Sequence, residues 1–200
     1  MDDAELKKKA DRLMNIECKT LGSEIQALLS YIQFKYGDEG LKKILDKCRD
    51  LGYPINQSQI RLGEWYKEGL NVLLFLLAKE LFQWTDQDLF QMGRDTTKMS
   101  LGVKMFIKYF VSIKKVFQSC PGYWRKFMDC GNMEAHEFSN EKRYAIFRLT
   151  GYDFEPFMCH YFKGFIFGIA ENALPGEHKL VEETACIYKG DPYHEFLVKW

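Results

Sequence analysis

The hydrophobic period of the chain changes near residue 130, and this change constrains the fold more than any other feature. From Asp2 to about Met128, apolar residues recur at three-and-four spacing, which is typical of amphipathic helices. After Cys130 the pattern predicts two strands, an aromatic-rich helix and two further strands, over residues 133–138, 143–149, 155–172, 179–188 and 193–200. This order predicts an α+β fold, with an N-terminal helical layer packed on a small antiparallel sheet.

The first 128 residues divide into several predicted helices. Their expected spans are 13–32, 41–51, 64–82, 85–91 and 98–118. Breaks are predicted at Tyr36-Gly37-Asp38 and at Gly52-Tyr53-Pro54, and Pro121-Gly122 is expected to close or kink the last helix. No repeat or flexible linker separates the parts. We therefore expect a single domain over 1–200, helical to about 128 and α/β from about 129.

The charge balance excludes several classes of protein. The chain has 28 basic and 28 acidic residues and no basic stripe, which argues against direct binding of nucleic acid. The longest apolar run, 70–82, is interrupted by Lys79 and Glu80 and is shorter than the roughly 20 residues of a membrane span. The N-terminus shows no apolar leader segment, and the six cysteines are scattered without a Cys-x-x-Cys pair. These features predict free thiols and a cytoplasmic protein.

The sharpest chemical signal lies in the last hairpin. If Gly190 centres its turn, Cys186 and His194 face each other, with Cβ atoms roughly 4.5–5.5 Å apart. A thiolate and an imidazole at that separation can grip one zinc ion. Glu183 lies three residues before Cys186, and Glu182 offers a second carboxylate. On a flat strand Glu183 and Cys186 point to opposite faces, so a shared metal requires a bulge or a strand end between them.

Cys159 is the fourth predicted ligand. It lies near the start of the preceding helix, where the helix dipole favours a thiolate. The plain alternative is that these cysteines are small buried side chains and that the glutamate is solvated. A catalytic pair of Cys186 and His194 without metal is a further, weaker alternative, whereas Cys159 and His160 are adjacent on a helix and diverge.

These residues carry a resemblance to a known family. The segment Pro156-Phe157-Met158-Cys159 with Gly164-Phe165, then Glu183-x-x-Cys186, Gly190-Asp191 and His194, resembles the 4-vinyl-reductase domain family. That family includes the sensor domains of phenol- and toluene-responsive transcription activators and stand-alone hydrocarbon-binding proteins. The specific motifs cover about 147–200, and the first half is similar only in architecture.

The resemblance implies a function for the chain. It implies a structural zinc held by Cys159, Glu183, Cys186 and His194, with histidine in place of the family's last cysteine. It also implies an apolar or aromatic ligand, a homodimer and a sensor-like binding module. The aromatic residues that could line a pocket, or simply fill the core, are Phe82, Trp84, Phe90, Phe106, Tyr109, Phe110 and Phe147.

Two other functions stay open. A haem-based gas sensor needs an axial ligand, commonly histidine, and the chain has none before His136, although Cys, Met and Tyr are present. An accessory role in the reduction of vinyl tetrapyrroles follows from the family name. No GxGxxG motif or P-loop supports an enzyme, and a zinc with four protein ligands has no open position. We therefore predict a binding module and not an enzyme.

Overall fold

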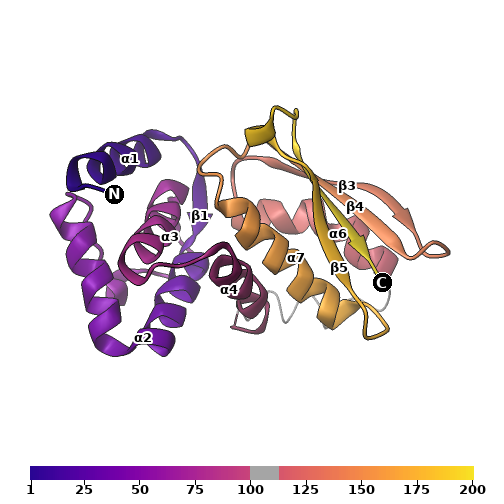
Figure 1. The fold of residues 1–200 in the computed structure, drawn as a ribbon, viewed down its shortest axis with the longest axis horizontal. Helices are drawn as coiled ribbons and strands as arrows, with labels where there is room; N and C mark the ends of the chain where they lie inside the picture. Colours follow the sequence, from indigo (N-terminus) through magenta and orange to yellow (C-terminus); the bar gives the residue numbers. More distant parts are fainter. Residues whose placement is uncertain (100–112) are drawn as a thin grey trace. The chain divides into compact units, whose positions relative to one another are not determined.

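The computed structural model describes residues 1–99 and 113–200, and its internal contacts divide the chain into two compact units. The first unit holds residues 1–85 with 127–129, and the second holds 86–126 with 130–200. The fold class is α+β, as predicted, with helices along the first part of the chain and an antiparallel sheet in the last third (Figure 1).

The first unit is built mainly from three helices. Its elements are α1 (Asp3–Asn15), β1 (Lys19–Leu21), α2 (Gly22–Asp50), η1 (Gln57–Gln59), β2 (Trp65–Lys67) and α3 (Glu68–Phe82). Every residue from Val72 to Ala78 is buried, so α3 is the central helix of this unit. A helix that is apolar on all sides is stable only when other elements surround it. For this reason the apolar run within 64–82 predicted a helix at the centre of the core.

Two local features of the first unit differ in how well the sequence predicts them. The break at Gly37 is confirmed, since this residue interrupts α2 with a φ of +70°, a conformation that glycine adopts without steric cost. The strands β1 and β2 were not predicted. They pair antiparallel, with Thr20 opposite Tyr66, and three residues are too few to show an alternating pattern.

The second unit contains the sheet and its covering helices. Its elements are α4 (Asp86–Met99), α6 (Ile113–Phe127), β3 (Asn132–Ser139), β4 (Tyr144–Thr150), α7 (Met158–Ala173), β5 (Leu180–Ala185), η2 (Ile187–Lys189) and β6 (His194–Lys199). The predicted order of strand, strand, helix, strand, strand is confirmed. The sheet runs β3-β4-β6-β5 with antiparallel neighbours throughout, so the last strand lies inside the sheet.

Helix α6 packs on the sheet and on α7. Phe117 contacts Phe138 and Phe147 with ring centroids 5.4 and 5.2 Å apart, and Trp124 lies 5.8 Å from Phe162 of α7. Of the two outcomes expected at Pro121-Gly122, closure of the helix is wrong, because α6 continues through Pro121 to Phe127. Proline removes one helix hydrogen bond, and the residues on both sides of it, Phe117 and Trp124, hold α6 through aromatic contacts.

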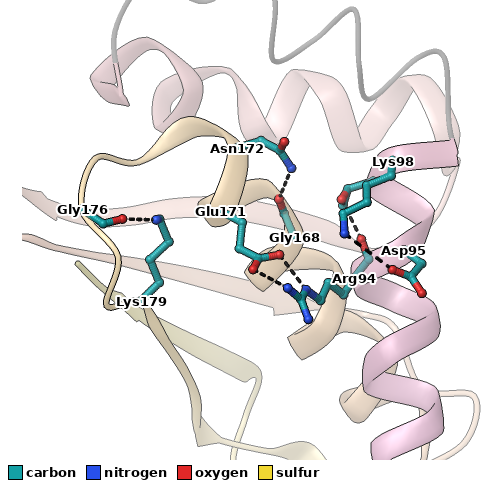
Figure 2. A network of polar contacts seen from close by, with 9 residues as sticks. Arg94, Asp95, Lys98, Gly168, Glu171, Asn172, Gly176 and Lys179 are labelled. Carbon is teal, nitrogen blue, oxygen red and sulfur yellow. Dashed lines mark hydrogen bonds and ion pairs between the residues drawn. The ribbon is translucent and has the colours of Figure 1, made fainter.

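Helices α4 and α7 approach so closely that their backbones touch. A Cβ on Gly164 would lie 1.9 Å from the Phe90 carbonyl oxygen, and one on Gly93 would lie 2.1 Å from that of Tyr161. Arg94 forms a bidentate ion pair with Glu171, with both contacts at 2.6 Å (Figure 2). These contacts fix the axis of α7 against α4.

Two further expectations are tested by the structure. Cys48, Cys120, Cys159 and Cys186 are free thiols, as predicted. None of the helices within 1–99 and 113–200 is long and apolar enough to cross a membrane.

Candidate functional site

The structure brings together the four residues that the sequence predicts as metal ligands. One ligand atom from each of Cys159, Glu183, Cys186 and His194 lies within 4.8 Å of the other three. Cys159 comes from the first turn of α7, Glu183 from β5, Cys186 from the position after β5 and His194 from the start of β6. Glu182 is exposed and takes no part in this cluster, which we call the Cys-Glu-Cys-His cluster.

A bulge in β5 allows Glu183 and Cys186 to share one site. Glu183 pairs with Phe196 and Ala185 pairs with Glu195, so the register shifts between the two pairs. The irregularity that a shared site requires is therefore present. Beyond the bulge the one remaining pair is Ala185 with Glu195, and Cys186 follows directly after the end of β5.

The distances within the cluster match those of a tetrahedral metal centre. Metal–sulfur bonds of about 2.3 Å and metal–nitrogen and metal–oxygen bonds of about 2.0–2.1 Å place ligand atoms about 3.8 Å (S to S), 3.6 Å (S to N) and 3.4 Å (N to O) apart. The observed distances are 3.8 Å between the two Sγ atoms, 3.6 Å from Cys159 Sγ to His194 Nδ1 and 3.2 Å from that Nδ1 to Glu183 Oε1. The donor set therefore fits one ion.

Contacts outside the cluster orient two of its members. His194 Nε2 donates a hydrogen bond to the Tyr152 carbonyl oxygen over 3.3 Å, which directs Nδ1 at Cys159 Sγ and Glu183 Oε1. The Cys186 backbone N–H donates to Asp191 Oδ2 over 2.8 Å. Sequence reasoning missed both partners. Asp191 has a signal in the Gly190-Asp191 turn, whereas a backbone carbonyl such as that of Tyr152 leaves none.

Burial and hydrogen bonding move the pKa values of Cys159 and Glu183 in opposite directions. Burial raises the pKa of the Cys159 thiol, and Glu183 and Cys186 raise it further, so the expected thiolate at the helix N-terminus is wrong for the metal-free state. Burial also acts to raise the pKa of Glu183, but hydrogen bonds with His194, Cys159 and Cys186 outweigh it and lower that pKa. A metal ion binding here therefore has to displace the thiol proton of Cys159, and its affinity rises with pH.

The predicted pocket residues do not form one group in the described part of the chain. Phe82 stacks on Tyr36 and Trp84 donates a hydrogen bond to the Tyr36 hydroxyl, all within the first unit. In the second unit Phe90 contacts Phe167, while Phe147 contacts Phe117 instead. Phe106, Tyr109 and Phe110 lie outside the described residues. The four described side chains thus pack against other aromatic rings.

Among known proteins, the chain matches solved structures but no family model and no curated sequence. An H-NOX protein from S. oneidensis in its Fe(II)NO ligation state is 10% identical, with a TM-score of 0.68 over 90% of this chain and 98% of that one. An oxygen-binding H-NOX domain related to soluble guanylate cyclases is 13% identical, with a TM-score of 0.62 over 89% and 93%. A third structure concerns haem distortion in the H-NOX family, at 14% identity and a TM-score of 0.62. The chain therefore has the H-NOX fold.

These matches correct the family resemblance and what it implied. The 4-vinyl-reductase assignment is wrong, because the similar structures are H-NOX domains over nearly their whole length. Structural zinc as the cofactor and an apolar or aromatic molecule as the ligand are wrong with it, since the similar proteins carry haem and bind nitric oxide or oxygen. The sensor-like function based on those two inferences is withdrawn. The alternative of a haem-based gas sensor agrees better with the fold.

Proposed function

We propose that this protein is a small-ligand sensor domain of the H-NOX type, and not an enzyme. The observation that supports the proposal is the architectural match over 90% of the chain at a TM-score of 0.68. Dissolved gases are the class of ligand that the similar structures name, as nitric oxide and oxygen complexes. A cytoplasmic location is part of this proposal.

A histidine-ligated haem does not fit this chain. The first 135 residues contain no histidine. His136 contacts Glu134 and Arg148 on the sheet, and His160 is 43% exposed beside Asp86. His178 is exposed in the connection before β5, and His194 belongs to the Cys-Glu-Cys-His cluster. No histidine thus offers a buried imidazole outside the cluster, and the proposed sensor works without imidazole-bound haem.

A haemin titration followed by absorption spectroscopy tests this part of the proposal. Purified protein is titrated with haemin under reducing conditions, and the product is exposed to carbon monoxide. We expect no Soret band of the imidazole-ligated type at any haemin ratio. A saturable band of that type at one haem per chain would contradict the exclusion of histidine. A band typical of thiolate, thioether or phenolate ligation that shifts with carbon monoxide would instead establish haem-based gas sensing through such a ligand.

We further propose that the Cys-Glu-Cys-His cluster binds one transition-metal ion. The agreement of three ligand-to-ligand distances with tetrahedral geometry supports this proposal. Two thiolates and an imidazole select ions of borderline or soft character over magnesium or calcium. Such an ion would join α7 to β5 and β6.

Cobalt(II) binding to the full chain tests the metal site. Tetrahedral thiolate ligation gives Co(II) intense visible bands and a sulfur-to-cobalt charge-transfer band. We expect both bands at one equivalent of Co(II) in the parent protein and in Cys120→Ser, a control that removes a free thiol from the same unit. In Cys186→Ser the bands should vanish, and the melting temperature should fall because metal-binding energy contributes to folding. Equal spectra and melting temperatures for the two variants would refute the site.

A further inference from the structure

We propose that Glu183 is an exchangeable ligand, and that its coordination position is a binding site for a small neutral nitrogen donor. This inference rests on the proposed metal site. In the exchange, the lone pair of the incoming nitrogen replaces a carboxylate oxygen on the ion. The released carboxylate stays ionised and turns toward solvent, so no proton or electron is transferred.

Glu183 is the most accessible member of the cluster. Its side chain is 15% exposed, whereas the His194 side chain is 3% exposed. Cys159 and Cys186 are exposed to only 7% and 3%. A ligand that enters from solvent therefore meets the Glu183 side of the cluster first.

Glu183 is also the member held least by its surroundings. His194 is fixed by the Tyr152 carbonyl and Cys186 by Asp191, while Cys159 is placed by the first turn of α7. Within the described residues, the polar partners of the Glu183 carboxylate are other members of the cluster itself. Ligating carboxylates usually have a further hydrogen-bond partner that orients them. Glutamate also has three rotatable side-chain bonds and costs more entropy to hold in place than cysteine.

The charge of the site favours a neutral replacement. A divalent ion with two thiolates and a neutral imidazole carries no net charge, and Glu183 adds one negative charge to a mostly buried centre. In the described part of the chain this carboxylate contacts His194 Nδ1, and no lysine or arginine is paired with it. An uncompensated buried charge is costly, so release of the carboxylate to solvent lowers that cost. A neutral donor keeps the centre neutral, whereas an anion restores the charge.

Titration of the Co(II)-loaded full chain with imidazole and with azide tests the exchange. We expect millimolar imidazole to shift the visible Co(II) bands of the parent protein, with cobalt retained after gel filtration, and azide to shift them much less. In Glu183→Ala the position is vacated, and we expect imidazole to shift the bands at a lower concentration than in the parent protein. Glu182→Ala, a change at the exposed neighbour, should behave as the parent.

The outcomes separate the two proposals. Failure of the parent protein to bind Co(II) refutes the metal site and this inference with it. Co(II) bands that respond to imidazole in neither the parent nor Glu183→Ala leave the metal site standing and refute the exchange. Azide acting as strongly as imidazole refutes the preference for a neutral donor. Because the parent protein is itself titrated, the test holds even if Glu183→Ala fails to fold.

Discussion

Replacing Gly164 by alanine should strongly destabilise the second unit, because this glycine is where α7 touches the backbone of α4. The new Cβ would lie 1.9 Å from the Phe90 carbonyl oxygen and 2.7 Å from its carbonyl carbon. Cβ contacts under 3.0 Å are essentially never observed, so the helices must separate locally by at least 1.1 Å, the difference between 3.0 and 1.9 Å. The obstructing atoms belong to helix backbone and cannot rotate away.

The expected loss follows from the cost of overpacking. Inserting a methyl group into a tight core costs typically 1–3 kcal/mol, and an unyielding backbone contact places Gly164→Ala at the upper end, about 3 kcal/mol. For a chain of this size that corresponds to roughly 6–12 °C in melting temperature. Separation of the helices should also stretch the Arg94–Glu171 ion pair, whose contacts are now 2.6 Å.

Gly122→Ala provides the matched control. Gly122 also lies inside a helix, α6, but an added Cβ there meets nothing within 4 Å. Alanine should therefore leave stability unchanged or raise it by up to about 1 kcal/mol through helix propensity. Thermal and urea unfolding of the two variants give the comparison. Equal stabilities would refute the backbone contact between α4 and α7.

Three other predictions concern single interactions. Tyr36→Phe removes the hydroxyl that accepts a hydrogen bond from the Trp84 indole N–H over 2.7 Å, and Trp84 is only 3% exposed. The free energy of unfolding, measured in urea, should therefore fall by about 1–3 kcal/mol. No loss would mean that water replaces the hydroxyl. Glu171→Gln removes the charge that pairs with Arg94 and should lower the free energy of unfolding by about 1 kcal/mol, and by less in high salt. A loss that does not depend on salt would contradict an electrostatic role. Burial raises the pKa of Glu24 from 4.5 to about 7, so the folded state holds this proton longer than the unfolded state, and stability should fall as pH rises from about 4.5 to 7. One pKa unit corresponds to about 1.4 kcal/mol, so the free energy of unfolding should fall by no more than about 3 kcal/mol over this pH range. The Glu24 side chain is partly exposed, which makes the expected fall smaller than this limit. Glu24→Gln should remove this pH dependence, and an unchanged profile would exclude Glu24 as its source.

The family assignment shows the limit of a local motif. Cys159 near the start of a helix, with the Glu183-x-x-Cys186 spacing and His194 eight residues later, correctly indicated four side chains that meet. It did not indicate the fold around them, because a few ligands on a hairpin and one helix can be carried by different architectures. The absence of histidine from the first 135 residues was visible in the sequence, yet its significance emerged only when 90% of the chain matched H-NOX structures, whose descriptions name haem and its gas ligands.

By itself, the sequence determined the elements whose hydrophobic pattern is long enough to read, and the residues of the cluster. Four strands around α7 and the break at Gly37 follow from local patterns, whereas a bulge or strand end between Glu183 and Cys186 was expected only on the condition that both bind one metal. Only the tertiary structure decided the placement of β6 between β4 and β5, the continuation of α6 through Pro121 and the contact of α4 with α7. These depend on residues distant in the chain, whose packing outweighs local preference.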